Sequence, residues 1–126
     1  MPFLASIARD AKVPHVLKQF NTGTGRPLLE FHEALLRGDS PFTVQQRELM
    51  AAYVSGVNAC RYCHGAHAAA AKQFGVPEKL LGRLIDDPTA SGVDEKLLPV
   101  LAFQRKEGLA TGELTLQTVK KLGINL

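Results

Sequence analysis

The sequence predicts an all-α protein, a helical bundle of about six helices. Apolar residues recur every three or four positions through most of the chain, which is the spacing that places them on one face of a helix. Residues that favour helix starts and helix ends stand between these segments. No run of alternating apolar and polar residues indicates a strand, and no internal repeat or low-complexity segment is present.

The first 25 residues are expected to be loosely ordered, apart from a short helix after Pro14 and a turn at residues 21–25. Pro27 suits an early position in a helix, because its missing N–H is not needed there and its φ angle is already helical. Leucines at helical spacing follow it up to Gly38, which predicts a helix over residues 27–38. Residues 39–42 are expected to form a loop.

Two adjoining helices are predicted in the middle of the chain. Thr43 and Gln46 have the spacing of a capping box, which indicates a helix start at Thr43. This helix ends near Gly56 or Asn58, and Asn58 is expected to cap the helix that follows. The second helix runs from about residue 60 to residue 74, where a series of alanines supplies high helix propensity.

Shorter helices complete the predicted bundle. Gly75 ends the preceding helix, and Pro77 begins another that reaches residue 85. After a loop at residues 87–92, a helix is predicted over residues 94–107, with Pro99 in its first turn or at a kink. A last short helix is expected over residues 115–122, ended by Gly123.

The length of 126 residues suits a single domain over residues 1–126, with its core from about residue 26 onward. The hydrophobic content of 45% is ordinary for a globular protein and allows a packed core. A chain this small buries a limited share of its surface, so association with further copies would help to stabilise it.

The composition also restricts the location and the partners of the protein. The longest apolar stretches are shorter than the ~18–20 residues that a membrane helix needs, and the first 15 residues lack the pattern of a secretory signal. We therefore expect a cytoplasmic protein that has no membrane partner. The net charge of +3 is mild, and basic residues alternate with acidic ones, which argues against a nucleic-acid partner.

Reactive side chains are concentrated between residues 60 and 67, in the segment Cys-Arg-Tyr-Cys-His-Gly-Ala-His. Residues three and four apart share a face of a helix, so Cys60, Cys63 and His67 are expected on one side. His64 lies to one side of Cys63 and is less well placed. Two cysteines this close together in an intracellular chain indicate metal or redox chemistry rather than a structural disulfide framework.

The cluster has the ingredients of a thiol that reduces peroxides. A Cys-x-x-Cys pair in the first turn of a helix can close a disulfide with modest adjustment. The helix N-terminus favours a thiolate, and a nearby imidazole that is oriented by an acid can accept the thiol proton. A thiolate that attacks an O–O bond becomes a sulfenic acid, with which a second cysteine can condense.

Three other interpretations of these residues stay open. The segment from Cys60 to His64 has the form of a c-type haem attachment site, although that requires export and the chain has only two methionines. The two cysteines with His64 and His67 could hold zinc, although closed zinc sites usually take their ligands from two separate segments. The cysteines could also be packing residues. We expect neither a metal nor a cofactor.

Three neighbouring residues are given structural interpretations when they are taken by themselves. Glu48, which follows Arg47, is typical of a solvated helix residue. Tyr62, between the two cysteines, is more typical of a packing aromatic than of a catalytic group. His64 is likewise interpreted as structural.

The arrangement of these residues matches a known pattern. The sequence resembles the alkylhydroperoxidase D-like family of the carboxymuconolactone decarboxylase superfamily over residues 48–74, and more loosely over about residues 25–125. The family pattern is a glutamate, eleven residues, Cys-x-x-Cys, three residues and a histidine. Four residues meet all of these spacings: Glu48, Cys60, Cys63 and His67.

The resemblance implies a role for each of the four residues. Cys63 would be the peroxidatic cysteine that becomes a sulfenic acid, and Cys60 would be the resolving cysteine that contacts the reductant. His67 would relay the proton, and Glu48 would orient or deprotonate His67. The resemblance also implies an all-helical fold, antioxidant reduction of hydrogen peroxide or organic hydroperoxides, homo-oligomers (trimers or hexamers), and a dithiol reductant such as a lipoyl group or a thioredoxin-like protein.

The chain departs from the family at two places, and two other activities stay open. Some members have a histidine between the cysteines, where this chain has Tyr62. Many relatives continue for another helix or more beyond the position of Leu126, so either the core of a monomer would be weaker or another subunit would provide that cover. The same cysteine pair would also serve a non-catalytic redox switch or a disulfide-exchange protein. Carboxymuconolactone decarboxylase activity is the other alternative, although that branch typically lacks the cysteine pair.

Overall fold

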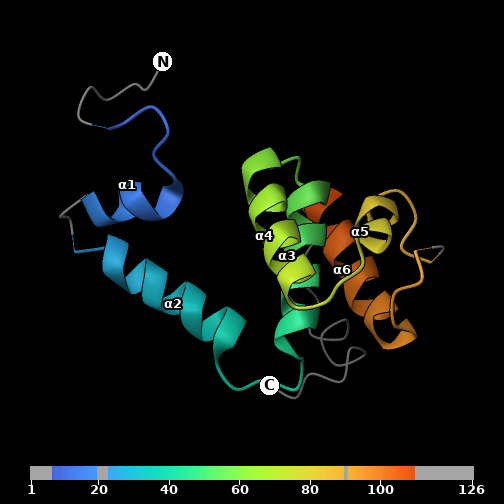
Figure 1. Cartoon of the computed structure of the whole chain (residues 1–126). Helices are drawn as coiled ribbons and strands as arrows, with labels where there is room; N and C mark the ends of the chain where they lie inside the picture. Colours follow the sequence, from blue (N-terminus) through green and yellow to red (C-terminus); the bar gives the residue numbers. More distant parts are fainter. Residues whose placement is uncertain (1–6, 20–22, 90, 110–126) are drawn as a thin grey trace. The chain divides into compact units, whose positions relative to one another are not determined.

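The computed structural model describes residues 7–19, 23–89 and 91–109. All the regular structure in these ranges is helical: six α-helices, α1 to α6, and one short 3₁₀ helix, η1 (Figure 1). This confirms the predicted all-α fold. The chain divides into two compact units, Met1–Pro41 and Phe42–Leu126. The single domain over residues 1–126 stays a prediction, and the helix expected at residues 115–122 lies outside the described ranges.

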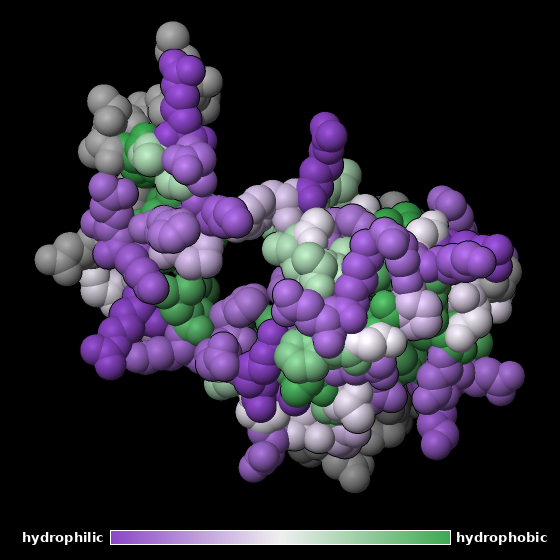
Figure 2. Space-filling view, in the orientation of Figure 1, coloured by the Kyte–Doolittle hydropathy of each residue, from purple (hydrophilic) through white to green (hydrophobic). Residues whose placement is uncertain are grey.

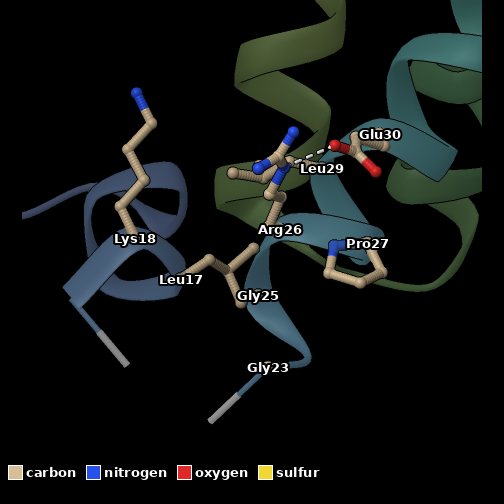
Figure 3. A pocket seen from close by; sticks show the side chains of 8 residues that line it. All are labelled: Leu17, Lys18, Gly23, Gly25, Arg26, Pro27, Leu29 and Glu30. Atoms are coloured by element: carbon tan, nitrogen blue, oxygen red, sulfur yellow. Dashed lines mark hydrogen bonds and ion pairs between the residues drawn. The ribbon is translucent and has the colours of Figure 1, made fainter. Parts of the chain in front are cut away.

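The first unit consists of two helices, α1 (Val13–Gln19) and α2 (Gly25–Arg37). As predicted, Pro27 lies in the first turn of α2. The two helices approach each other closely at Gly25, because a Cβ atom there would collide with the backbone carbonyl of Leu17. A depression of about 670 Å³ lies beside this contact, and Figure 3 shows the residues that line it.

The second unit is built around α3 (Val44–Val57), which contacts α4 (Arg61–Gln73), α5 (Glu78–Leu84) and α6 (Leu98–Leu109). The 3₁₀ helix η1 (Glu95–Leu97) leads directly into α6. Among the described residues, nine buried ones form the core between these elements: Leu49, Ala52, Tyr53, Ala71, Val76, Leu81, Leu84, Leu97 and Leu101. Figure 2 shows hydrophilic side chains over much of the visible surface, with smaller apolar patches between them.

Local sequence signals determine most of the helix ends in this unit. The predicted capping box is present: the Gln46 N–H donates to Thr43 Oγ1 at 3.2 Å, and the Thr43 N–H donates to Gln46 Oε1 at 2.9 Å. Gly75 follows α4 with φ +91°, a left-handed conformation that suits glycine. Pro99 is the second residue of α6, so it lies in the first turn, where its missing N–H costs no hydrogen bond.

Among the described residues, no helix is both long enough and apolar enough to cross a membrane.

Candidate functional site

The cysteine pair lies where α3 ends and α4 begins. Asn58 is the C-cap of α3, and Ala59 follows it with φ +55°. The Ala59 N–H donates to the Gly56 carbonyl at 3.0 Å, and the Cys60 N–H donates to the Ser55 carbonyl at 2.9 Å. These two bonds form a Schellman motif, which satisfies the last carbonyls of α3. The connection between the two helices is therefore very short.

Cys60, rather than Asn58, is the N-cap of α4. Its Sγ atom accepts a hydrogen bond from the Cys63 N–H at 3.3 Å. The expectation that Asn58 caps α4 is wrong, because Asn58 belongs to the end of α3 and the Schellman motif occupies the residue after it. The Cys60 sulfur thus lies at the positive end of a helix dipole, where a thiolate would be stabilised.

Cys60 and Cys63 are joined by a disulfide, with their Cα atoms 5.4 Å apart. This separation lies within the range of roughly 4.4–6.8 Å that disulfides usually span. It confirms the expectation that this pair can close in the first turn of the helix. Both cysteines are half-buried, so the disulfide is neither sealed in the core nor fully exposed.

The buried Glu48 of α3 and the half-buried His67 of α4 form a hydrogen-bonded pair beside this turn. The distance between Glu48 Oε2 and His67 Nδ1 is 2.8 Å. Glu48 is only 1% exposed, so its interpretation from the sequence alone as a solvated residue is wrong. An ionised carboxylate only accepts hydrogen bonds, so the His67 Nδ1 carries the hydrogen. The Nε2 atom of the neutral ring is then the basic nitrogen, in the same way that an acid orients the histidine of a catalytic triad.

Helix packing brings these two residues together across 19 positions of sequence. α3 and α4 are joined by the short turn at Asn58 and Ala59, so they lie side by side and run in opposite directions. The resemblance to the family indicated this pairing. The charge and the apolar periodicity of α3 did not indicate it, because the position of Glu48 relative to α4 depends on how the two helices are rotated against each other.

Two other residues near the disulfide differ from each other in exposure. His64 is half-buried, and its Nδ1 donates to the Ala52 carbonyl of α3 at 2.8 Å, so the ring is anchored to α3. Tyr62 is 48% exposed, so it does not pack in the core of this unit. Tyr62 precedes Cys63 by one position, so the two side chains lie on different faces of α4.

The site does not coincide with the depression in Figure 3, which is lined by residues of the first unit and contains neither cysteine nor histidine. Within the described part of the chain, no group of three or more His, Cys, Asp or Glu side chains is gathered in the manner of metal ligands. The site contains the Cys60–Cys63 disulfide and the imidazoles of His64 and His67.

Comparison with known proteins identifies the family of the chain. A model of the carboxymuconolactone decarboxylase family matches residues 23–96, which is more than half of the 126 residues. The chain belongs to this family. The matched segment of this family member includes all four residues of the sequence pattern, from Glu48 to His67.

A solved structure agrees with this assignment. The family member is similar to the crystal structure of an uncharacterized peroxidase-related protein from Silicibacter sp. TM1040, with 28% sequence identity and a TM-score of 0.74. The match covers 88% of this chain and 61% of that protein, so this chain spans less than two thirds of its length. No curated protein matches the chain.

Proposed function

We propose that this family member is a thiol-dependent peroxidase of the alkylhydroperoxidase D-like kind, which reduces hydrogen peroxide or organic hydroperoxides in antioxidant defence. The observation that carries the proposal is the Cys60–Cys63 disulfide on a helix whose His67 is bound to the buried Glu48. The similar protein from Silicibacter supports it, because that protein is described as peroxidase-related.

Oxidation of Cys63 is the first step of the proposed reaction. The His67 Nε2 accepts the thiol proton, and the resulting thiolate attacks the terminal oxygen of the peroxide. The O–O bond breaks, Cys63 becomes a sulfenic acid, and the departing alkoxide or hydroxide takes the proton from His67. Glu48 keeps the His67 ring in the required tautomer and stabilises the imidazolium that forms for a moment.

Closure of the disulfide is the second step. The Cys60 sulfur attacks the sulfenic sulfur of Cys63, the S–O bond breaks, and water leaves. This step yields the disulfide between these two residues. A dithiol such as a lipoyl group or a thioredoxin-like protein would then reduce it, with Cys60 as the point of contact, to complete the cycle. A cytoplasmic location and assembly into trimers or hexamers are further parts of this proposal.

The test is a reaction with one equivalent of hydroperoxide, followed by mass spectrometry of the intact chain. The unmodified protein should lose two hydrogens as its disulfide forms. The Cys60→Ser variant should retain a sulfenic acid at Cys63 that dimedone traps, and the Cys63→Ser variant should consume no peroxide. Peroxide consumption by a folded Cys63→Ser variant would contradict the assigned roles.

One observation favours disulfide exchange as a second candidate function. The Cys63 N–H points at the Cys60 sulfur, so Cys60 has the environment of a stabilised thiolate that attacks disulfides. The reduced protein should then reduce a disulfide substrate such as insulin and become oxidised itself. Rapid insulin reduction together with thiols that stay reduced in peroxide would favour this function over the peroxidase.

A further inference from the structure

The two histidines of α4 stand in the same relation to the two cysteines. His64 follows Cys60 by four residues, and His67 follows Cys63 by four residues. The His64 N–H donates to the Cys60 carbonyl at 2.9 Å, so the first turn of α4 is closed. Side chains four apart lie on one face of a helix, and each leans toward the helix N-terminus. Each histidine thus follows its cysteine by about one helical turn.

Both imidazoles are anchored to α3 through the same nitrogen. The His67 Nδ1 is 2.8 Å from a carboxylate oxygen of Glu48, and the His64 Nδ1 is 2.8 Å from the carbonyl oxygen of Ala52. A carbonyl oxygen cannot donate, so the His64 Nδ1 carries the hydrogen. The Nε2 atom is consequently the basic nitrogen of the neutral His64 ring, as it is in His67.

The ring of His64 has a defined place on α3. It lies against Gly56, where an added Cβ atom would be 3.2 Å from Nδ1 and would collide with the side chain of Ile85. Glu48 and Ala52 are also four residues apart, so the two anchors lie one turn apart on α3. His64 is therefore anchored to α3 through Nδ1 as His67 is, one helical turn closer to Cys60.

The two anchors differ in charge. The carboxylate of Glu48 stabilises an imidazolium on His67, whereas the neutral carbonyl of Ala52 does so more weakly. His64 therefore has a neutral anchor on α3, whereas His67 has a charged one.

We infer that His64 is the proton acceptor and donor for Cys60, as His67 is for Cys63. The inference rests on the proposed function, in which Cys60 resolves the sulfenic acid. The Cys60 thiol gives its proton to the His64 Nε2 while the S–S bond forms and the S–O bond of Cys63 breaks. The departing hydroxide takes that proton and becomes water. The Cys60 sulfur is oxidised in this step, and the sulfenic sulfur is reduced.

The test isolates Cys60 in a Cys63→Ser chain and needs no peroxide. The rate at which iodoacetamide alkylates Cys60 at pH 7 is compared with and without His64→Asn. The asparagine amide nitrogen replaces Nδ1, so it can keep the bond to Ala52, but the variant has no counterpart of Nε2. We expect alkylation to slow by about tenfold, because only the thiolate reacts. Equal rates would overturn the inference, since anchoring alone would then explain His64.

A matched control and a second measurement complete the test. His15→Asn changes an exposed histidine of α1 and should leave the alkylation rate unchanged. Nitrogen-15 NMR spectra are recorded on the Cys63→Ser chain, in which His64 is unchanged. This measurement therefore does not depend on whether the His64→Asn variant folds. The Nε2 signal of His64 should move when Cys60→Ser is added, and an unchanged signal would overturn the inference. Peroxide consumption by the unmodified chain tests the proposed function separately.

Discussion

The substitution Glu48→Gln removes the charge of the buried acid and keeps its size. Glu48 is 1% exposed and lies 2.8 Å from His67, so the variant side chain faces the same nitrogen. If the amide oxygen accepts from Nδ1, the tautomer survives but the imidazolium loses its counter-charge. If the amide nitrogen donates to Nδ1 instead, the hydrogen moves to Nε2, and His67 can no longer accept the Cys63 proton.

Both orientations slow the oxidation of Cys63. Loss of general-base assistance costs roughly a factor of 10² to 10⁴, and loss of an acid that holds a histidine tautomer lies near the upper end of that range. At about 1.36 kcal/mol for each factor of ten, the barrier rises by roughly 2.7–5.4 kcal/mol. The free energy of unfolding should change by less than about 1 kcal/mol, because loss of the hydrogen bond to the charged carboxylate is offset by the lower desolvation cost of an amide.

The assay follows sulfenic acid formation at Cys63 in the Cys60→Ser background under excess hydrogen peroxide, beside urea unfolding of the same variants. Glu33→Gln, on an exposed part of α2, is the control and should match the parent protein in both measurements. A Glu48→Gln variant that oxidises at the parental rate would refute the role of the pair. A large loss of stability would instead show that Glu48 acts by holding the fold together.

Urea unfolding tests three predictions about the elements that support the site. Gly56→Ala should destabilise the fold by about 1–3 kcal/mol, because the new Cβ collides with the Ile85 side chain. Gly65→Ala should instead stabilise α4 by about 0.5–1 kcal/mol, because a Cβ there has nothing within 4 Å. Similar responses at both glycines would contradict this packing. Ala59→Gly should add about 0.5–1 kcal/mol, because Ala59 has φ +55°, and a loss of stability would show that the turn is unstrained. Tyr53→Phe should add about 1 kcal/mol, because the buried hydroxyl has no hydrogen-bond partner in the described part of the chain; a destabilised variant would count against that assignment.

Signals that lie close together in the sequence predicted much of the fold. The capping box at Thr43 and the stop at Gly75 were predicted correctly, because each depends on backbone geometry within one helical turn. Pro99 was expected in a first turn or at a kink of a helix from residue 94, and it lies in the first turn of a helix that begins at Leu98. Asn58 was expected both near the end of α3 and as the cap of α4, and only the first expectation is confirmed. The end of α3 and the start of α4 lie within the same few residues, and the sequence alone does not show which of the two Asn58 caps.

The candidate site was predicted partly from the sequence and partly only from the tertiary structure. The spacing of Cys60, Cys63 and His67 was visible in the sequence, because residues three and four apart share a face of any helix. The burial of Glu48, the exposure of Tyr62 and the anchoring of His64 required the tertiary structure. The physical reason is that burial and pairing depend on how α4 is rotated against α3. That rotation is settled by contacts between residues 19 and 12 positions apart, which no local pattern encodes.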